Sequence, residues 1–142
     1  MEISNHHERF VAATPERVAA AIADFDAIWP TQIAPAPRQL KRCLYDAGPM
    51  LWEEVDRPGA ARAFRVIWPQ WLQGEHWFEL ELVDGGTRLR HIVKGQALGK
   101  YEAVWSERIE PMHERVLEAL LDNVEAVVPA EGSIVSRMSA PN

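Results

Sequence analysis

The stretch Pro111 to Val128, PMHERVLEALLDNVEAVV, decides the fold because it has the pattern of one long amphipathic helix. Its apolar residues recur at steps of four, four, four and three, which puts them on one stripe of a helix with about 3.6 residues per turn. The stripe consists of Met112, Val116, Leu120, Val124 and Val127. The acidic residues fall elsewhere, and so long a stripe needs an apolar surface to cover it. We therefore expect the preceding chain to form a sheet.

Short segments in which apolar and polar residues alternate precede this helix, and turn residues separate them. They predict six antiparallel strands, at residues 3–13, 38–45, 50–56, 61–68, 75–83 and 87–96. After the first strand, Thr14 supplies an N-cap and Pro15 suits the first helical position, so a helix begins there. A second short helix ends before Pro30. Residues 100–109 predict a further helix that kinks or restarts at Pro111.

The last hairpin has the best-defined register. A two-residue turn, either Asp84-Gly85 or Gly85-Gly86, puts the apolar residues of both strands on one face. That inner face carries His76, Phe78, Leu80 and Leu82 from one strand and Leu89, His91 and Val93 from the next. On the outer face, two glutamates of the first strand lie opposite two arginines of the second, which is typical of a solvated surface.

The same parity argument extends to the earlier strands if their turns contain an even number of residues. Leu40, Arg42 and Leu44 then share the inner face with Leu51, Glu53 and Val55, and with Phe64, Val66 and Trp68. In this register Arg42 lies opposite Glu53 and forms an ion pair on an apolar surface. A bulge at Pro58-Gly59 would reverse the assignment.

Length and charge limit the class of protein. The 142 residues fit one domain, which we expect to span residues 1–128, followed by a loose tail at 129–142. A net charge of −6 argues against nucleic acid or an anionic membrane as partner. No apolar run approaches the roughly 20 residues of a membrane span, and the N-terminus lacks the pattern of a signal peptide, so the cytoplasm is the expected location. Cys43 is the single cysteine, which excludes an internal disulfide.

The order of these elements resembles the helix-grip superfamily that includes START domains, birch-pollen-allergen proteins and polyketide cyclases, often grouped as SRPBCC proteins. The resemblance lies in residues 13–18 (ATPERV), in the segment from Asp24 to Pro30, and above all in residues 74–80 (GEHWFEL) and 84–89 (DGGTRL), before the long final helix. It implies an α+β fold in which a curved antiparallel sheet of six to seven strands grips the last helix. It also implies a cavity for an apolar molecule between them.

In such a fold the inward-facing residues become the candidate ligand-binding residues: Phe64, Val66, Trp68, Phe78, Leu80, Leu89, His91, Met112, Val116 and Leu120. His91 is the most suggestive of them, because it could orient a ligand or act as a base, although a histidine satisfied within the core is the plainer interpretation. His76 begins its strand, where exposure at the rim is the simpler view. The six tryptophans either fill the core or line the cavity.

No pattern predicts a metal or another cofactor. His6, His7 and Glu8 are adjacent, so on a strand their side chains alternate between faces and cannot converge. A phosphate-binding loop and a nucleophile elbow are also absent from the sequence.

The leading hypothesis is therefore the binding of a small, largely apolar molecule between sheet and helix. One alternative is an enzyme of the cyclase or dehydratase type, with His91 as the base and the pair of Arg42 and Glu53 steering an enolate. A second alternative is a protein-interaction module whose interior is filled by its own side chains. The ligand and the oligomeric state, a homodimer included, stay open.

Overall fold

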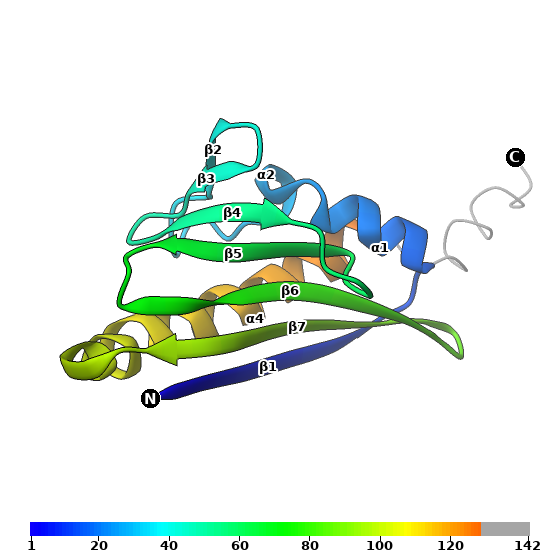
Figure 1. Ribbon diagram of the computed structural model, residues 1–142. Coiled ribbons are helices and arrows are strands. Elements are labelled where there is room, and N and C mark those ends of the chain that lie inside the picture. The colour runs from blue at the N-terminus through cyan, green and yellow to red at the C-terminus, as the bar shows by residue number, and fades with distance from the viewer. Residues whose placement is uncertain (129–142) are drawn as a thin grey trace, which may run out of the picture.

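The computed structural model describes residues 1–128, and the tail expected at 129–142 lies outside them. One antiparallel sheet of seven strands wraps around the final helix, with the strand order β1-β7-β6-β5-β4-β3-β2 (Figure 1). The strands are β1 (Glu2–Val11), β2 (Arg38–Lys41), β3 (Leu44–Asp46), β4 (Leu51–Val55), β5 (Arg62–Trp68), β6 (Leu72–Val83) and β7 (Gly86–Ala97). This is the helix-grip arrangement that the sequence predicts.

The prediction of six strands is wrong by one, because residues 38–45 do not form a single strand. The chain turns back at Arg42 and Cys43, so that β2 pairs with β3 as a separate small hairpin. Cys43 has a φ of 64° at this turn, a left-handed backbone conformation that residues other than glycine rarely adopt. The turn therefore takes Arg42 away from the inner face of the sheet.

The hairpin of β6 and β7 confirms the predicted register. Val83 pairs with Gly86, so the turn consists of Asp84 and Gly85. Gly85 has a φ of 85°, which glycine adopts at little cost. Phe78 lies opposite His91 and Leu80 opposite Leu89 on the inner face, as expected. On the outer face Arg88 and Arg90 both bind the carboxylate of Glu81, at 2.8 and 3.3 Å.

The register predicted for β4 and β5 is wrong. Val55 pairs with Ala63, so an odd number of residues, 56–62, separates these two partners, and a bulge lies between Leu51 and Trp52. An odd loop exchanges the two faces of a strand, because side chains alternate with a period of two. Trp52 and Glu54 consequently replace Leu51, Glu53 and Val55 on the inner face, beside Val66 and Phe64.

Two short helices lie between β1 and β2. Helix α1 (Pro15–Ile22) begins as predicted, with the Thr14 hydroxyl accepting from the backbone N–H of Arg17. Helix α2 (Phe25–Ile28) follows it and ends before Pro30. After β7 come η1 (Gly99–Tyr101), α3 (Glu102–Val104), the π-helical segment η2 (Trp105–Ile109) and α4 (Glu110–Val127). The wider π turns immediately precede Pro111, whose missing N–H interrupts the regular ladder.

Helix α4 lies across the inner face of the sheet, and packed side chains fill only part of the space between the two. Towards the C-terminal end of α4, an apolar core contains Val18 and Ile22 of α1, Leu89 of β7, and Leu121 and Val124 of α4, each at most 1% exposed. A smaller cluster at the opposite end contains Ile3, Leu72, Ala97 and Trp105. The inner face between these clusters is open to a cavity.

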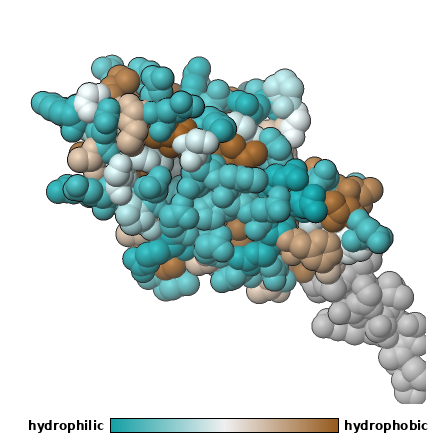
Figure 2. Space-filling view, turned by 90° about the horizontal axis from the view of Figure 1, so that it is seen from below, coloured by the Kyte–Doolittle hydropathy of each residue, from teal (hydrophilic) through white to brown (hydrophobic). Residues whose placement is uncertain are grey.

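The seam between β1 and α4 is polar, because acidic residues that lie off the apolar stripe of α4 face β1. Asn5, His7 and Arg9 alternate along the inner face of β1, and each contacts acidic side chains of α4. Arg9 binds Glu118, Asp122 and Glu125 at 3.3, 2.8 and 2.9 Å. Figure 2, seen from below relative to Figure 1, shows a mostly hydrophilic face. Within residues 1–128, none of the helices is long and apolar enough to cross a membrane.

Candidate functional site

A cavity of about 880 Å³ lies between the sheet and the first half of α4. Strands β4 to β7 form one wall, the segment from Val104 to Leu120 forms the other, and residues 33–38 and 46–50 border it. The volume is within the range of roughly 300 to 1,000 Å³ that is usual for small-molecule sites.

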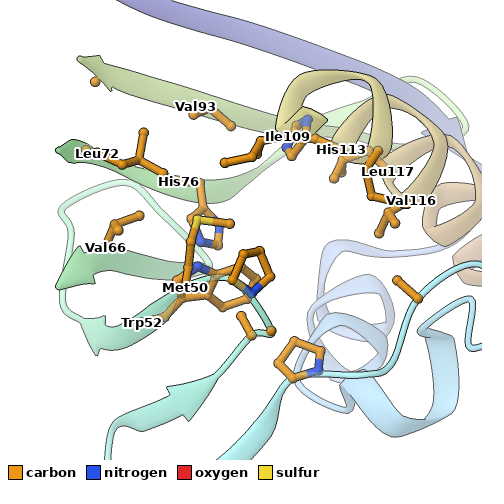
Figure 3. Close-up of a pocket in the computed structure, with 18 of the residues that line it drawn as sticks. Met50, Trp52, Val66, Leu72, His76, Val93, Ile109, His113, Val116 and Leu117 are labelled. Carbon is orange, nitrogen blue, oxygen red and sulfur yellow. The ribbon is translucent and has the colours of Figure 1, made fainter. Parts of the chain in front are cut away.

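The cavity wall is largely apolar. Figure 3 shows Met50, Val66, Leu72, Val93, Ile109, Val116 and Leu117 at the wall. Polar side chains interrupt this surface mainly where His76 and His91 of the sheet face His113 of α4. Further polar residues of the lining are Arg38, Asp46, Gln73, Glu75, Lys94 and Arg108.

Two paired glycines allow β6 and β7 to approach each other closely beside the cavity. Gly74 of β6 pairs with Gly95 of β7, and both line the cavity. A Cβ on Gly95 would lie 2.2 Å from the carbonyl oxygen of Gln73, and a Cβ on Gly74 would lie 2.6 Å from that of Lys94. Such contacts are impossible without moving one strand away from the other. The close approach of the two strands at this end therefore depends on the absence of side chains.

Six of the ten candidate ligand-binding residues line the cavity: Val66, Phe78, His91, Met112, Val116 and Leu120. Phe64, Leu80 and Leu89 instead belong to the packed core or lie against it, beyond the cavity. Trp68 does not line the cavity either, and it is 54% exposed. The bulge at Leu51 and Trp52 explains this, because Leu51 pairs with Trp68 whereas its neighbour Trp52 pairs with Val66.

The predicted pair of Arg42 and Glu53 does not form. Arg42 lies in the β2–β3 turn, while Glu53 pairs in register with Leu44 and binds Arg65 on the exposed face. An ion pair does lie on the inner face, but it joins Arg62 to Glu54. The Nε of Arg62 is 3.1 Å from Glu54 Oε2, and the Tyr45 hydroxyl donates to Glu54 Oε1 at 3.0 Å.

Contacts with several neighbouring residues fix the position of the Arg62 side chain. It donates to the carbonyl oxygen of Ile22 at 2.8 Å, and its guanidinium carbon lies 4.1 Å from the ring centre of Phe25. Its side chain is only 10% exposed. This network ties α1 to β3, β4 and β5 behind the cavity. We assign it to the scaffold, because its members other than Phe25 do not line the cavity.

Four of the five histidines form a continuous row across the inner face. The ring centres of His76 and His91 are 5.5 Å apart, those of His91 and His113 are 5.5 Å apart, and those of His113 and His7 are 5.8 Å apart. His76 also contacts Trp52, with ring centres 4.3 Å apart. The expectation that His76 lies exposed at the rim is wrong, since it is only 9% exposed.

Burial keeps the central imidazoles neutral. It is the main cause that lowers the pKa of His76 to about 3, with the nearby positive charges of His113 and Arg62 as lesser causes. Burial also lowers the pKa of His113 to about 4, and that of His91 well below its ordinary value. A charged imidazole loses its hydration when it is buried in an apolar wall. Near neutral pH each of these rings therefore carries one N–H and one lone pair.

Most nitrogen atoms of this row are shielded from solvent. His91 Nε2 and His76 Nδ1 are 3.4 Å apart and share one hydrogen bond. The other nitrogen of each ring, both nitrogens of His113 and the indole nitrogen of Trp52 are shielded and have no hydrogen-bond partner in the described part of the chain. The cavity thus presents mainly carbon atoms, even at its histidines.

The sequence contains only a weak signal for the inward-facing residues that the prediction lacked. Trp52 and Arg62 became inward-facing through an odd loop whose length the residue types do not define. His113 lies directly after Met112 of the predicted stripe, and the cavity reaches one residue beyond that stripe. His7 was recognisable only by its alternation with Asn5 and Arg9, which matches the four-residue spacing of Glu114, Glu118 and Asp122 on α4.

Comparison with solved structures supports the same fold. The di-domain ARO/CYC StfQ from the steffimycin biosynthetic pathway superposes with a TM-score of 0.63 and 16% identity, over 95% of this chain and 53% of that one. The protein TTHA0849 from Thermus thermophilus gives 0.61 and 16% over 89% of this chain and 97% of the other. A START superfamily protein from Mycobacterium smegmatis gives 0.57 and 17% over 89% and 96%.

These similarities define the class of protein: the chain has the helix-grip fold that START proteins and ARO/CYC proteins share. It spans about half of StfQ. No family model and no curated protein matches the sequence. With identities this low, the comparisons establish the fold alone.

Proposed function

We propose that the protein binds a small, largely apolar molecule in the cavity between its sheet and α4. The observation that carries the proposal is the cavity of about 880 Å³, whose wall is largely apolar and whose histidine nitrogens are mostly shielded from solvent. Burial of apolar ligand surface, at about 25 cal/mol per Å², supplies most of the affinity. The resemblance to the helix-grip superfamily implies an apolar cavity in the same place, which agrees with the proposal.

The two alternatives have less support. The cyclase or dehydratase hypothesis required Arg42 and Glu53 beside His91, and these two residues lie elsewhere. His91 shares a hydrogen bond with the equally buried His76 instead. The interaction-module hypothesis required an interior filled by side chains, and the cavity does not meet that requirement. A location in the cytoplasm stays a prediction from the sequence.

A pair of tryptophan variants tests the proposed cavity. Val66 lines the cavity, whereas its neighbour Ile67 lies on the other face of β5 and is 41% exposed. Val66→Trp adds a large side chain at the cavity wall, and Ile67→Trp adds the same side chain on the outside. Anilinonaphthalene sulfonate (ANS), an aromatic probe that fluoresces in apolar sites, reports binding in a titration.

We expect Val66→Trp to weaken the binding of ANS by at least about tenfold, which corresponds to roughly 1.4 kcal/mol. Ile67→Trp should bind ANS as the parent protein does. Native mass spectrometry of the freshly purified parent should also detect a co-purified apolar molecule that Val66→Trp lacks. Equal affinity for ANS in the two variants, with both folded by circular dichroism, would rule out this cavity as the binding site.

A further inference from the structure

Behind the cavity wall, where β1 meets α4, three side chains that commonly bind metals come together. His7 of β1 and His113 and Glu114 of α4 each place one ligand atom within 4.8 Å of the others. His7 is 9% exposed, while the side chain of Glu114 is 45% exposed and reaches the surface. The cluster therefore has buried nitrogen atoms and one route to solvent.

Three of the four ring nitrogens of this cluster have no hydrogen-bond partner among residues 1–128. Both nitrogens of His113 are buried without a hydrogen-bond partner among residues 1–128. His7 Nε2 lies 3.0 Å from Glu114 Oε2, yet the two atoms do not have the geometry of a hydrogen bond. Unpaired buried polar atoms are costly and uncommon. Their presence at one point indicates that a further group belongs there.

Neighbouring side chains orient two of the three groups. His7 Nδ1 is 2.7 Å from Glu118 Oε2, so this ring nitrogen donates to the carboxylate and leaves the lone pair of a neutral ring on Nε2. The side-chain amide of Asn5 donates to Glu114 Oε1, which turns Oε2 towards His7. A carboxylate behind a histidine is the usual outer support of a metal ligand.

We propose that His7, His113 and Glu114 bind one divalent transition-metal ion, with Glu118 and Asn5 as their outer hydrogen-bond partners. Two imidazoles and one carboxylate suit Zn²⁺, Co²⁺ or Ni²⁺. Ligands of a tetrahedral ion with bonds of about 2.0 Å lie about 3.3 Å apart, so small side-chain rotations close the site. Three protein ligands leave one position open, and His113 also lines the cavity. The proposal does not depend on the apolar ligand.

The same atoms suit one other arrangement, in which His7 contacts Glu114 and Glu118 directly without any metal. Metal titration separates the two. Thiolates are zinc ligands and Cys43 is an exposed free thiol, so all proteins carry Cys43→Ser to remove this competing group. Chelator-treated protein is titrated with Zn²⁺ by calorimetry near neutral pH, and with Co²⁺ by visible absorption, which reports the coordination geometry.

We expect the Cys43→Ser parent to bind one Zn²⁺ per chain. His113→Gln and Glu114→Gln should each weaken binding by more than about tenfold, and Glu118→Gln by about 10- to 100-fold through the loss of outer support. His6→Gln is the matched control, because His6 is the exposed neighbour of His7 on the same strand. It should leave the affinity and the Co²⁺ spectrum unchanged.

If His113→Gln fails to fold, Glu114→Gln still tests the proposal. The Glu114 side chain is 45% exposed, so its substitution should leave the fold intact. Absence of Zn²⁺ binding to the parent would overturn the proposal and leave the cluster as a direct contact of His7 with the two carboxylates. Binding that survives unchanged in both Glu114→Gln and Glu118→Gln would also overturn it, because the ion would then be held elsewhere.

Discussion

His91 Nε2 lies 3.4 Å from His76 Nδ1, so two buried imidazoles share one hydrogen bond inside the hollow end of the protein. Each can act as the donor, and in either case one N–H and one lone pair of the pair stay without a partner in the described chain. Such a pair is stable only while both rings are neutral. The folded state is therefore sensitive to acid at this point.

The free energy of unfolding should fall as the solution is made mildly acidic. The pKa of His76 is about 3 in the folded protein, against an ordinary value of 6.5. Below about 6.5 the unfolded chain takes up a proton that the folded chain refuses, so stability is complete above this pH and is lost as the pH falls towards 3. Between about pH 7 and pH 5, His76 alone should contribute a loss of roughly 2 kcal/mol.

Urea unfolding at several pH values measures this effect, with His76→Gln as the test and exposed His6→Gln as its control. His76 faces Trp52, Phe64 and His91, with the charges of Arg62 and His113 nearby. The slope of stability against pH should flatten in His76→Gln and persist in His6→Gln. Equal slopes in all three proteins would show that His76 does not resist protonation.

Arg62→Met should destabilise the protein far more than Arg65→Met, although the two arginines lie on the same strand. Arg62 is 10% exposed and its loss leaves Glu54 without its cation, whereas Arg65 and Glu53 form a pair that is 56% and 40% exposed. Breaking a buried pair costs about 3–5 kcal/mol, and we expect about 2–3 here because Glu54 is a third exposed. The exposed pair should contribute less than about 1 kcal/mol.

Chemical denaturation of the two variants checks this difference. The double variant Glu54→Gln with Arg62→Met should regain part of the loss, because no uncompensated charge is left. Equal losses in Arg62→Met and Arg65→Met would contradict the assignment of Arg62 to the scaffold.

Gly95→Ala should lower the free energy of unfolding by at least about 2 kcal/mol, since the new methyl group meets the backbone of β6 instead of a movable side chain. Gln96→Ala, one residue further along and exposed, should change stability by less than about 0.5 kcal/mol. Thermal unfolding followed by circular dichroism compares the two. A Gly95→Ala protein as stable as the parent would mean that β6 and β7 separate easily at this end.

The parts of the fold that the sequence predicted are those that local chemistry specifies. The Asp84-Gly85 turn defines the register of β6 and β7, and Thr14 with Pro15 defines the start of α1. The failures arose where the chain length between strands decides the outcome. An odd loop after Val55 exchanged the faces of β4, which removed Glu53 from the inner face and brought Glu54 to it.

The candidate site was predicted in its apolar part and missed in its polar part. Periodicity places Val66, Phe78 and Val116 at the cavity, because apolar side chains follow the regular spacing of strands and helices. The row of histidines comes from three strands and one helix. His7 and His113 meet only because β1 pairs with β7 at the edge of the sheet, beneath α4. Such a meeting depends on topology and has no local sequence pattern.

Helix α4 contributes side chains both to the packed core and to the cavity wall. Leu121 and Val124 pack in the core, and Val116 lines the cavity. Substitutions at distant sites have nearly independent effects on stability. During evolution, side chains around the cavity can consequently change its shape and chemistry, while the packed end preserves the folded state. Because separate parts of one α-helix stabilise the fold and line the cavity, this architecture can change its cavity without losing its fold.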